Sequence, residues 1–110
     1  MSIVRAAATK RPITPSLDDG PVFLAGFQAN RPAVGVHDDL YVRSIALALE
    51  HSVQDGSHPP CLVLALCDLI GLLRADVLLI RQALEKRGID TRGIVIASTH
   101  VHSGPDTIGL

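Results

Sequence analysis

Two histidines near the end of the chain have the spacing of a metal-binding or acid–base pair. His100 and His102 are separated by one residue, after an apolar run and before a Ser-Gly-Pro turn, in the segment IVIASTHVHSGPDTIGL. In an extended strand, residues two apart point to the same face at about 7 Å, so two imidazoles can converge on one metal ion. Neutral histidine can also act as a general acid or base. The alternative interpretation is that both are ordinary polar residues where a strand meets water.

A strand, a helix and a second strand are predicted to position this pair. Residues 61–68 (CLVLALCD) form an apolar run of strand length, residues 74–87 have helical periodicity, and residues 93–100 (GIVIASTH) form a second apolar run. Such a βαβ unit almost always makes a right-handed crossover between parallel strands. The branched aliphatic composition is also typical of strands covered on both faces. We therefore predict an α/β fold with a mixed sheet that contains this unit.

Asp68 is the acidic residue expected nearest to the histidine pair. It ends the first of the two strands, and His100 with His102 ends the second. Parallel strands end on the same edge of a sheet, where ligands bind in α/β folds. Asp68 is therefore a candidate metal ligand or a group that orients one, or it is simply a carboxylate at the end of a strand.

The predicted helix has an apolar stripe and a charged stripe. The stripe expected to face the sheet consists of Leu73, Val77, Ile80 and Leu84. The stripe expected to face water consists of Arg74, Arg81 and Glu85, in which the last two have the spacing of a helical ion pair. Gly88 is expected to end the helix, as a glycine commonly does at this position.

The first half of the chain is less regular. Pro12 and Pro15 exclude a continuous helix over residues 1–20 and leave a short strand or extended segment. Residues 40–53 alternate as a strand would, although they also contain good helix formers, and we predict a strand. A turn at 54–60 follows. Residues 21–39 are predicted to form an irregular loop anchored to the core by Val22, Phe23, Leu24 and Phe27.

Five further side chains have chemistry of their own. His37 lies beside two aspartates in a predicted loop and is a weaker site candidate, whereas His51 and His58 flank the predicted turn and are expected to be solvated. Cys61 and Cys67 lie in one strand, about 20 Å apart by strand geometry, which is too far for a disulfide. We interpret both as buried thiols in a reducing compartment.

Composition narrows the classes of function. The chain has 110 residues, 47% of them hydrophobic, and a formal net charge of -1, so it forms at most one domain. The basic residues are scattered rather than clustered, which argues against nucleic-acid binding. The first residues lack the apolar core of a signal peptide, which suggests a cytoplasmic location. The longest apolar runs are too short for a transmembrane segment.

The segment STHVHSGPDT closely resembles the Thr-His-x-His-Ser-Gly-Pro signature of the neutral/alkaline, non-lysosomal ceramidase family. Further similarity lies in ITP at 13–15, AGF at 25–27, VHDDLYVRSIAL at 36–47 and CDLIGL at 67–72. The resemblance covers nearly the whole chain. It implies that residues 1–110 are the N-terminal portion of a zinc hydrolase domain, so that the fold is an incomplete part of a larger domain. It also favours a strand at 36–47.

The family resemblance also implies roles for individual residues. His100 matches a zinc ligand, and His102 matches a histidine that contacts the substrate or the developing oxyanion. Gly26, in the glycine-containing loop, is a weaker candidate for a backbone contact with the substrate. The implied activity is zinc-dependent hydrolysis of an N-acyl amide bond in ceramide or a related N-acyl lipid, with zinc as the Lewis acid.

This sequence also departs from the family pattern. The remaining zinc ligands and the nucleophilic serine of the family lie downstream of the motif, beyond Leu110, and neither Ser98 nor Ser103 is expected to replace that serine. The chain alone is therefore expected to be inactive, to bind zinc poorly and to self-associate through uncovered apolar surface. One alternative is a truncated, non-catalytic relative that acts as an oligomeric or metal-binding protein. Another is a structural domain without a metal.

Overall fold

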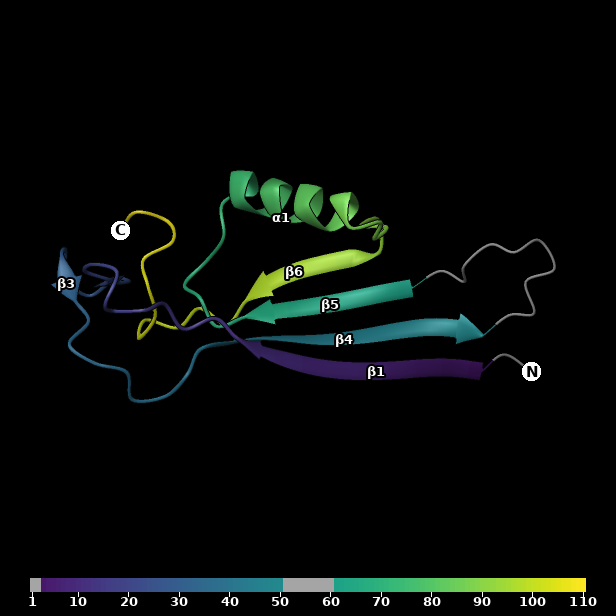
Figure 1. The fold of residues 1–110 in the computed structure, drawn as a ribbon, viewed down its shortest axis with the longest axis horizontal. Helices are drawn as coiled ribbons and strands as arrows, with labels where there is room; N and C mark the ends of the chain where they lie inside the picture. Colours follow the sequence, from purple (N-terminus) through teal and green to yellow (C-terminus); the bar gives the residue numbers. More distant parts are fainter. Residues whose placement is uncertain (1–2, 51–60) are drawn as a thin grey trace.

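The computed structural model describes residues 3–50 and 61–110, which form a four-stranded mixed sheet with a helix on one side (Figure 1). The order of strands across the sheet is β1-β4-β5-β6, and a separate pair, β2 and β3, forms a short hairpin. The elements are β1 (Ile3–Pro12), β2 (Phe23–Leu24), β3 (Arg31–Pro32), β4 (Tyr41–Glu50), β5 (Cys61–Cys67), α1 (Arg74–Lys86) and β6 (Ile94–Ser98).

The predicted βαβ unit is confirmed. β5 and β6 are parallel neighbours, in register from Val63 opposite Ile94 to Cys67 opposite Ser98, and α1 connects them. Both strands therefore end at the same edge of the sheet, toward the loops at the left of Figure 1. The α/β class and the mixed sheet are as predicted. The second strand ends earlier than expected, at Ser98 rather than at residue 100.

The antiparallel half of the sheet is more extensive than the sequence indicated. β1 is a full ten-residue strand rather than a short one, and it pairs with β4 from Ile3 opposite Glu50 to Pro12 opposite Tyr41. A proline is tolerated there because it is the last residue of an edge strand. The strand predicted from residue 40 is confirmed as β4. The predicted turn at 54–60, together with His51 and His58, lies outside the described residues.

The ends of α1 agree with the sequence prediction, whereas the prediction that Arg81 faces water is wrong. The Asp76 carboxylate accepts a hydrogen bond from the Leu73 amide at 3.0 Å and so satisfies one free donor at the N-terminus. Gly88 follows the last turn with a φ of 78°, as predicted. Arg81 does not face water: its guanidinium donates to the carbonyl oxygens of Thr91 and Ile94 at 2.6 and 2.7 Å.

Glu85 also turns toward the connection after the helix. Its carboxylate accepts a hydrogen bond from the hydroxyl of Thr91 at 2.7 Å, and Thr91 is the buried polar residue among those described. Arg81 therefore binds the turn before β6 instead of facing solvent, whereas Glu85 is exposed, as predicted, and also bonds to this turn. Both side chains therefore link α1 to the segment that leads into β6.

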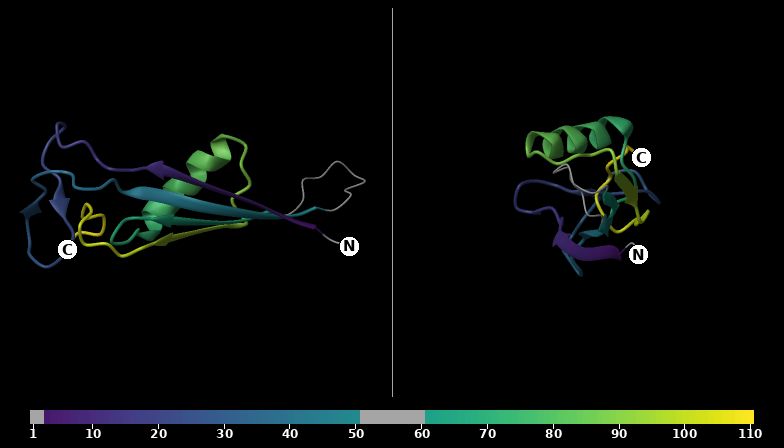
Figure 2. Two further views of the ribbon diagram at one scale, coloured as in Figure 1. Left: turned by 90° about the horizontal axis from the view of Figure 1, so that it is seen from below. Right: turned by 90° about the vertical axis from the view of Figure 1, so that its right-hand side faces the viewer.

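The core lies between α1 and the sheet. Ile80 and Leu84 from the helix face Val63 and Ala65 of β5 and Ile96 of β6, around an apolar groove of about 610 Å³. Figure 2 shows α1 along one side of the sheet only. Among the described residues, the buried apolar ones are Ala25, Cys67, Ile70 and Ile94.

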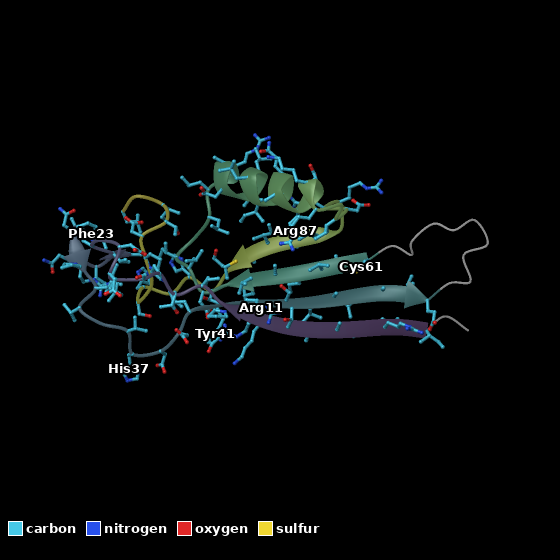
Figure 3. The ribbon with its side chains drawn as sticks, viewed as in Figure 1. Arg11, Phe23, His37, Tyr41, Cys61 and Arg87 are labelled. Atoms are coloured by element: carbon cyan, nitrogen blue, oxygen red, sulfur yellow. The ribbon has the colours of Figure 1, made fainter. Side chains whose placement is uncertain are left out.

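Two predictions about burial are wrong. Cys67 is buried, but Cys61 is exposed because it lies at the start of β5, beyond the part of the sheet that α1 covers (Figure 3). Phe23 and Phe27 do not anchor the loop 21–39 in the core, since 43% and 87% of their surfaces are exposed. The loop is held instead by backbone pairing of Leu24 with Pro105.

α1 has 13 residues, and the described part of the chain contains no helix with the length and hydropathy of a membrane span.

Candidate functional site

The histidine pair lies just beyond the end of β6 in a sharply bent segment. The prediction that both residues belong to an extended strand is wrong, because His100 has a φ of 65°. This left-handed conformation is strained for a residue with a Cβ atom, and such strain is concentrated at functional sites. The bend still brings the two rings together, with centroids 5.0 Å apart and planes at 82°.

Both imidazoles are held in one tautomer by the backbone. Nδ1 of His100 lies 2.9 Å from the carbonyl oxygen of Ile70, and Nδ1 of His102 lies 3.1 Å from that of Ala25. A carbonyl oxygen only accepts hydrogen bonds, so each Nδ1 carries the proton. The lone pair of each neutral ring is therefore on Nε2. This is the usual arrangement of a metal-binding histidine, whose other nitrogen donates to a carbonyl or carboxylate.

The backbone of His100 is fixed to the loop after β5. The amide of His100 donates to the carbonyl oxygen of Leu69 at 3.0 Å, and the amide of Thr99 donates to that of Cys67 at 2.9 Å. These two bonds, one to the last residue of β5 and one to the loop after it, extend the pairing past the end of β6. The amide bond to Leu69 and the ring hydrogen bond to Ile70 therefore fix both the backbone and the side chain of His100 to the loop after β5.

Gly26 lies directly against the ring of His102. A Cβ atom on Gly26 would lie only 2.6 Å from Nδ1 of the His102 ring, and the glycine has a φ of 71°. A side chain is therefore excluded here for two reasons, contact and backbone conformation. The structure brings together His100, His102 and the loop that contains Gly26, the three residues singled out from the sequence.

Arg31 is a residue of this site that the sequence did not indicate. One nitrogen of its guanidinium, Nη2, donates to the carbonyl oxygens of His102 at 2.7 Å and Ala25 at 3.3 Å. Its Nε is buried and has no hydrogen-bond partner among the described residues. Arg31 therefore joins the loop of Gly26 to the histidine motif. An arginine beside a turn carries no signal of such a role, because its two acceptors come from distant parts of the chain.

Phe27, predicted to anchor its loop in the core, lies at the site instead. Its ring centroid is 4.7 Å from that of His102, and the guanidinium of Arg31 lies 5.8 Å from the Phe27 ring. Phe27 has a φ of 62° and Asn30 a φ of 54°. Strained backbone therefore occurs on both segments that meet here, the loop of Gly26 and the motif itself.

Asp68 connects three strand ends and does not approach as a ligand. One of its oxygens accepts from the Tyr41 amide at 3.0 Å and from Arg43 at 2.6 Å, and the other accepts from the Thr99 hydroxyl at 3.2 Å. Burial raises the pKa of this carboxyl, but the Arg43 hydrogen bond, the Tyr41 amide and the Arg43 charge outweigh it, and the pKa is lowered. Of the alternatives left open, the structure favours a structural carboxylate at the end of β5.

His37 lies apart from the other two histidines. Its Nδ1 is 2.6 Å from the Asp38 carboxylate, and its side chain is 97% exposed. Figure 3 places it at the outer edge of its loop. It borders a cavity of about 700 Å³ that neither His100 nor His102 lines.

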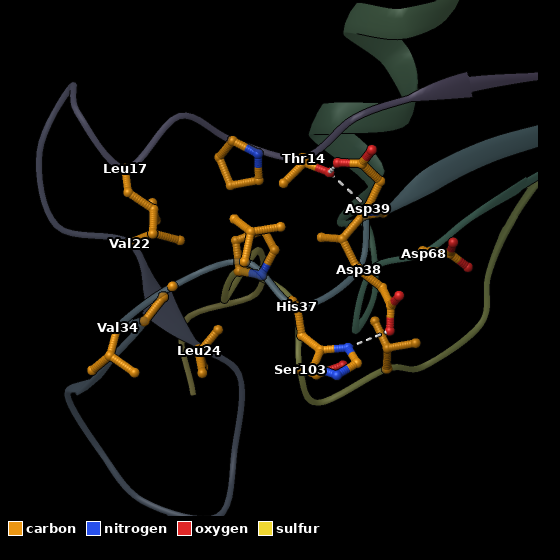
Figure 4. A pocket seen from close by; sticks show the side chains of 18 of the residues that line it. Thr14, Leu17, Val22, Leu24, Val34, His37, Asp38, Asp39, Asp68 and Ser103 are labelled. Atoms are coloured by element: carbon orange, nitrogen blue, oxygen red, sulfur yellow. Dashed lines mark hydrogen bonds and ion pairs between the residues drawn. The ribbon is translucent and has the colours of Figure 1, made fainter.

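This cavity has walls of two kinds (Figure 4). One wall is apolar and the other is polar, with Asp39 of the polar wall already bonded to the Thr14 hydroxyl at 2.7 Å. The apolar wall consists of Leu17, Val22, Leu24 and Val34, and the polar wall includes His37, Asp38, Asp39, Asp68 and Ser103.

The residues present fit part of a zinc site. Each histidine offers one Nε2, whereas zinc in proteins takes three or four protein ligands. Within residues 3–50 and 61–110, no three side chains of His, Cys, Asp or Glu are grouped so that they could hold one ion. Each histidine could therefore supply one ligand, and a closed zinc site would need donors beyond the described side chains.

Comparison with protein-family models, with curated proteins and with solved structures finds no match to this chain.

Proposed function

We propose that this chain forms the histidine-bearing part of a zinc-dependent amide hydrolase similar to the neutral ceramidases, with His100 as the metal ligand. The observation that supports this most directly is the pair of bonds from Nδ1 to Ile70 and Ala25, which leave both Nε2 atoms available. The motif STHVHSGPDT supports the same assignment by resemblance.

The two histidines take different roles in this proposal. His100, bound through backbone and side chain to the loop after β5, holds the ion through Nε2. His102, whose ring centroid lies 5.0 Å from that of His100, would present its Nε2 to the reacting carbonyl. There it contacts the carbonyl oxygen as a donor when protonated and stabilises the negative charge that develops on it. Zinc, when bound, supplies Lewis-acid activation of the amide.

Gly26 is proposed to line the substrate site. Without a side chain it leaves room for the His102 ring, and its backbone lies next to that ring. The resemblance to the ceramidase family implies that the substrate is an N-acyl lipid such as ceramide. The exposed ring of Phe27, in contact with His102, provides an apolar surface beside the proposed reaction centre.

The further ligands and the nucleophile come, in this proposal, from polypeptide other than the described residues. Two imidazoles do not make a closed zinc site, and apparent affinity depends on how many ligands are prearranged. The chain of 110 residues is therefore expected to bind zinc weakly and to show no amidase activity by itself.

A titration with Co²⁺ or Zn²⁺ tests the ligand assignment without requiring activity. We expect weak binding by the unmodified chain, a loss of about tenfold or more in affinity for His100→Ala, and a smaller loss for His102→Ala. His37→Ala is the matched control, because His37 is exposed and lines a different cavity. Equal affinity in all four proteins would contradict a metal role for His100.

The second candidate function is a small oligomeric protein in which zinc is shared between chains. The observation that favours it is the scarcity of buried residues in the described chain. Two copies could then supply four imidazole nitrogens to one ion. Sedimentation with and without a chelator tests this candidate, because a shared ion predicts a mass that falls when the metal is removed.

A further inference from the structure

One face of the sheet is apolar and uncovered by any described residue. From Val42 to Leu49 of β4, exposed side chains that point away from α1 alternate with less exposed ones that point toward it. We call this surface the outer face. Its members are Val4, Ala6 and Ala8 of β1, Ile45, Leu47 and Leu49 of β4, Leu62, Leu64 and Leu66 of β5, and Val95 and Ala97 of β6.

The exposed fractions on the outer face are high for large aliphatic residues. Ile45 is 51% exposed, Leu62 52%, Leu64 47%, and Val95 50%. These residues come from three adjacent strands, so the patch is contiguous. It amounts to on the order of 500 Å² of apolar surface per chain, at the upper end of what a monomeric protein exposes.

The charges on this side of the sheet are confined to one end. Among the described residues, Lys10 and Arg43 face outward near the carboxyl end of β1 and the start of β4, and both lie over the Tyr41 ring. Arg43 is also paired with Asp68 at 2.6 Å. The centre of the face lacks the inward-pointing lysines by which natural sheets prevent association.

The shape of the chain agrees with a missing layer. Its radius of gyration is 17.4 Å, whereas a compact domain of this length has about 13 Å. The longest dimension is 56 Å and the other two are 25 and 23 Å. A second sheet stacked at about 10 Å would thicken the molecule and bury the outer face.

We infer that the outer face is a dimer interface, on which a second copy of this chain stacks sheet against sheet about a two-fold axis. Two such faces would bury on the order of 1,000 Å², about the smallest area of a specific interface. The two-fold axis runs across the strands, because this arrangement places the cationic ends with Lys10 and Arg43 at opposite ends of the interface. An axis along the strands would bring them together.

This inference is independent of the proposed zinc site. The outer face contains no histidine, and its association needs no metal. Dimerisation through the outer face therefore persists in a chelator and in His100→Ala, whereas association through a shared zinc ion is lost in both. Failure of one proposal leaves the other standing.

Sedimentation equilibrium of the 110-residue chain, over a range of concentrations and in the presence of a chelator, tests the inference. We expect a mass of twice 11.7 kDa, and Leu64→Glu is expected to weaken dimerisation by about a hundredfold, since it places two carboxylates in an apolar interface. Leu79→Glu is the matched control, because Leu79 is a 64% exposed leucine of α1 and its substitution should leave the mass unchanged.

A second substitution on the outer face controls for misfolding of the first variant. Ile45→Glu changes a different strand of the outer face, and circular dichroism of both variants should show the helix and sheet content of the unmodified chain. A folded monomer at all concentrations, a dimer that survives both substitutions, or equal disruption by Leu79→Glu would each overturn the inference.

Discussion

Gly26 and His102 lie so close that a single methyl group cannot be added between them: a Cβ atom on Gly26 would be 2.6 Å from Nδ1 of the His102 ring. That nitrogen is the one that donates to the Ala25 carbonyl oxygen. The ring of His102 can therefore bond to Ala25 only because the next residue, Gly26, has no side chain. The loop and the motif form one unit, although 76 positions separate these two residues in the sequence.

The first prediction concerns this contact. Gly26→Ala should rotate the His102 ring out of its present position and lower the free energy of unfolding by about 2 kcal/mol, since alanine is also strained at a φ of 71°. Gly35→Ala is the control, because nothing lies within 4 Å of a Cβ atom there. The NMR signals of the His102 ring measure the rotation, and denaturant unfolding measures the loss of stability. Unshifted ring signals in Gly26→Ala would contradict the contact.

The second prediction concerns the bridge made by Arg31. Arg31→Met keeps much of the side-chain length but removes both bonds to the Ala25 and His102 carbonyl oxygens. We expect a loss of about 2 kcal/mol in unfolding free energy, as for other hydrogen bonds to charged groups. Arg11→Met serves as the comparison, because Arg11 is exposed on β1. If both variants lose equally little stability, Arg31 does not hold the loop to the motif.

The third prediction concerns acid stability. The pKa of Asp68 in the folded protein lies below its ordinary value, because its bonds to Arg43, Tyr41 and Thr99 outweigh the opposing effect of burial. The unfolded chain therefore binds a proton more readily, and stability from Asp68 is complete above about pH 4 and lost as the pH falls further.

Asp68→Asn should consequently lower stability at neutral pH by about 2 kcal/mol and make the acid limb of the stability curve less steep. Asp19→Asn, in an exposed turn, should leave the curve unchanged. The measurement is urea unfolding at a series of pH values from 7 down to the acid transition. An unchanged acid limb in Asp68→Asn would show that another group dominates it.

The fourth prediction separates the two cysteines. Burial, and to a smaller extent the Asp68 carboxylate, raise the pKa of the Cys67 thiol, whereas Cys61 is exposed. A thiol reagent at neutral pH should therefore modify one equivalent rapidly and the second only as the protein unfolds, since the thiolate is the reactive form. In Cys61→Ser the rapid phase should vanish. Two equally rapid phases in the unmodified chain would contradict the burial of Cys67.

The sequence by itself determined the βαβ unit, because β5, α1 and β6 are specified by local patterns. Each is a continuous apolar run or a helical repeat with its own end signal, such as Gly88. The spacing of His100 and His102 and their place after a strand were also readable, and they identified the pair from residues alone.

Only the tertiary structure decided how the pair is held and which neighbours matter. The acceptors of the two rings, Ile70 and Ala25, and the bridging Arg31 come from parts of the chain that no local pattern connects. Strand periodicity predicts that His100 continues β6, but its left-handed backbone, with a φ of 65°, bends the chain away from the strand. The burial of Cys67 but not Cys61, and the inward turn of Arg81, follow from where α1 lies on the sheet. Hydropathy records how apolar a residue is, whereas packing decides what covers it.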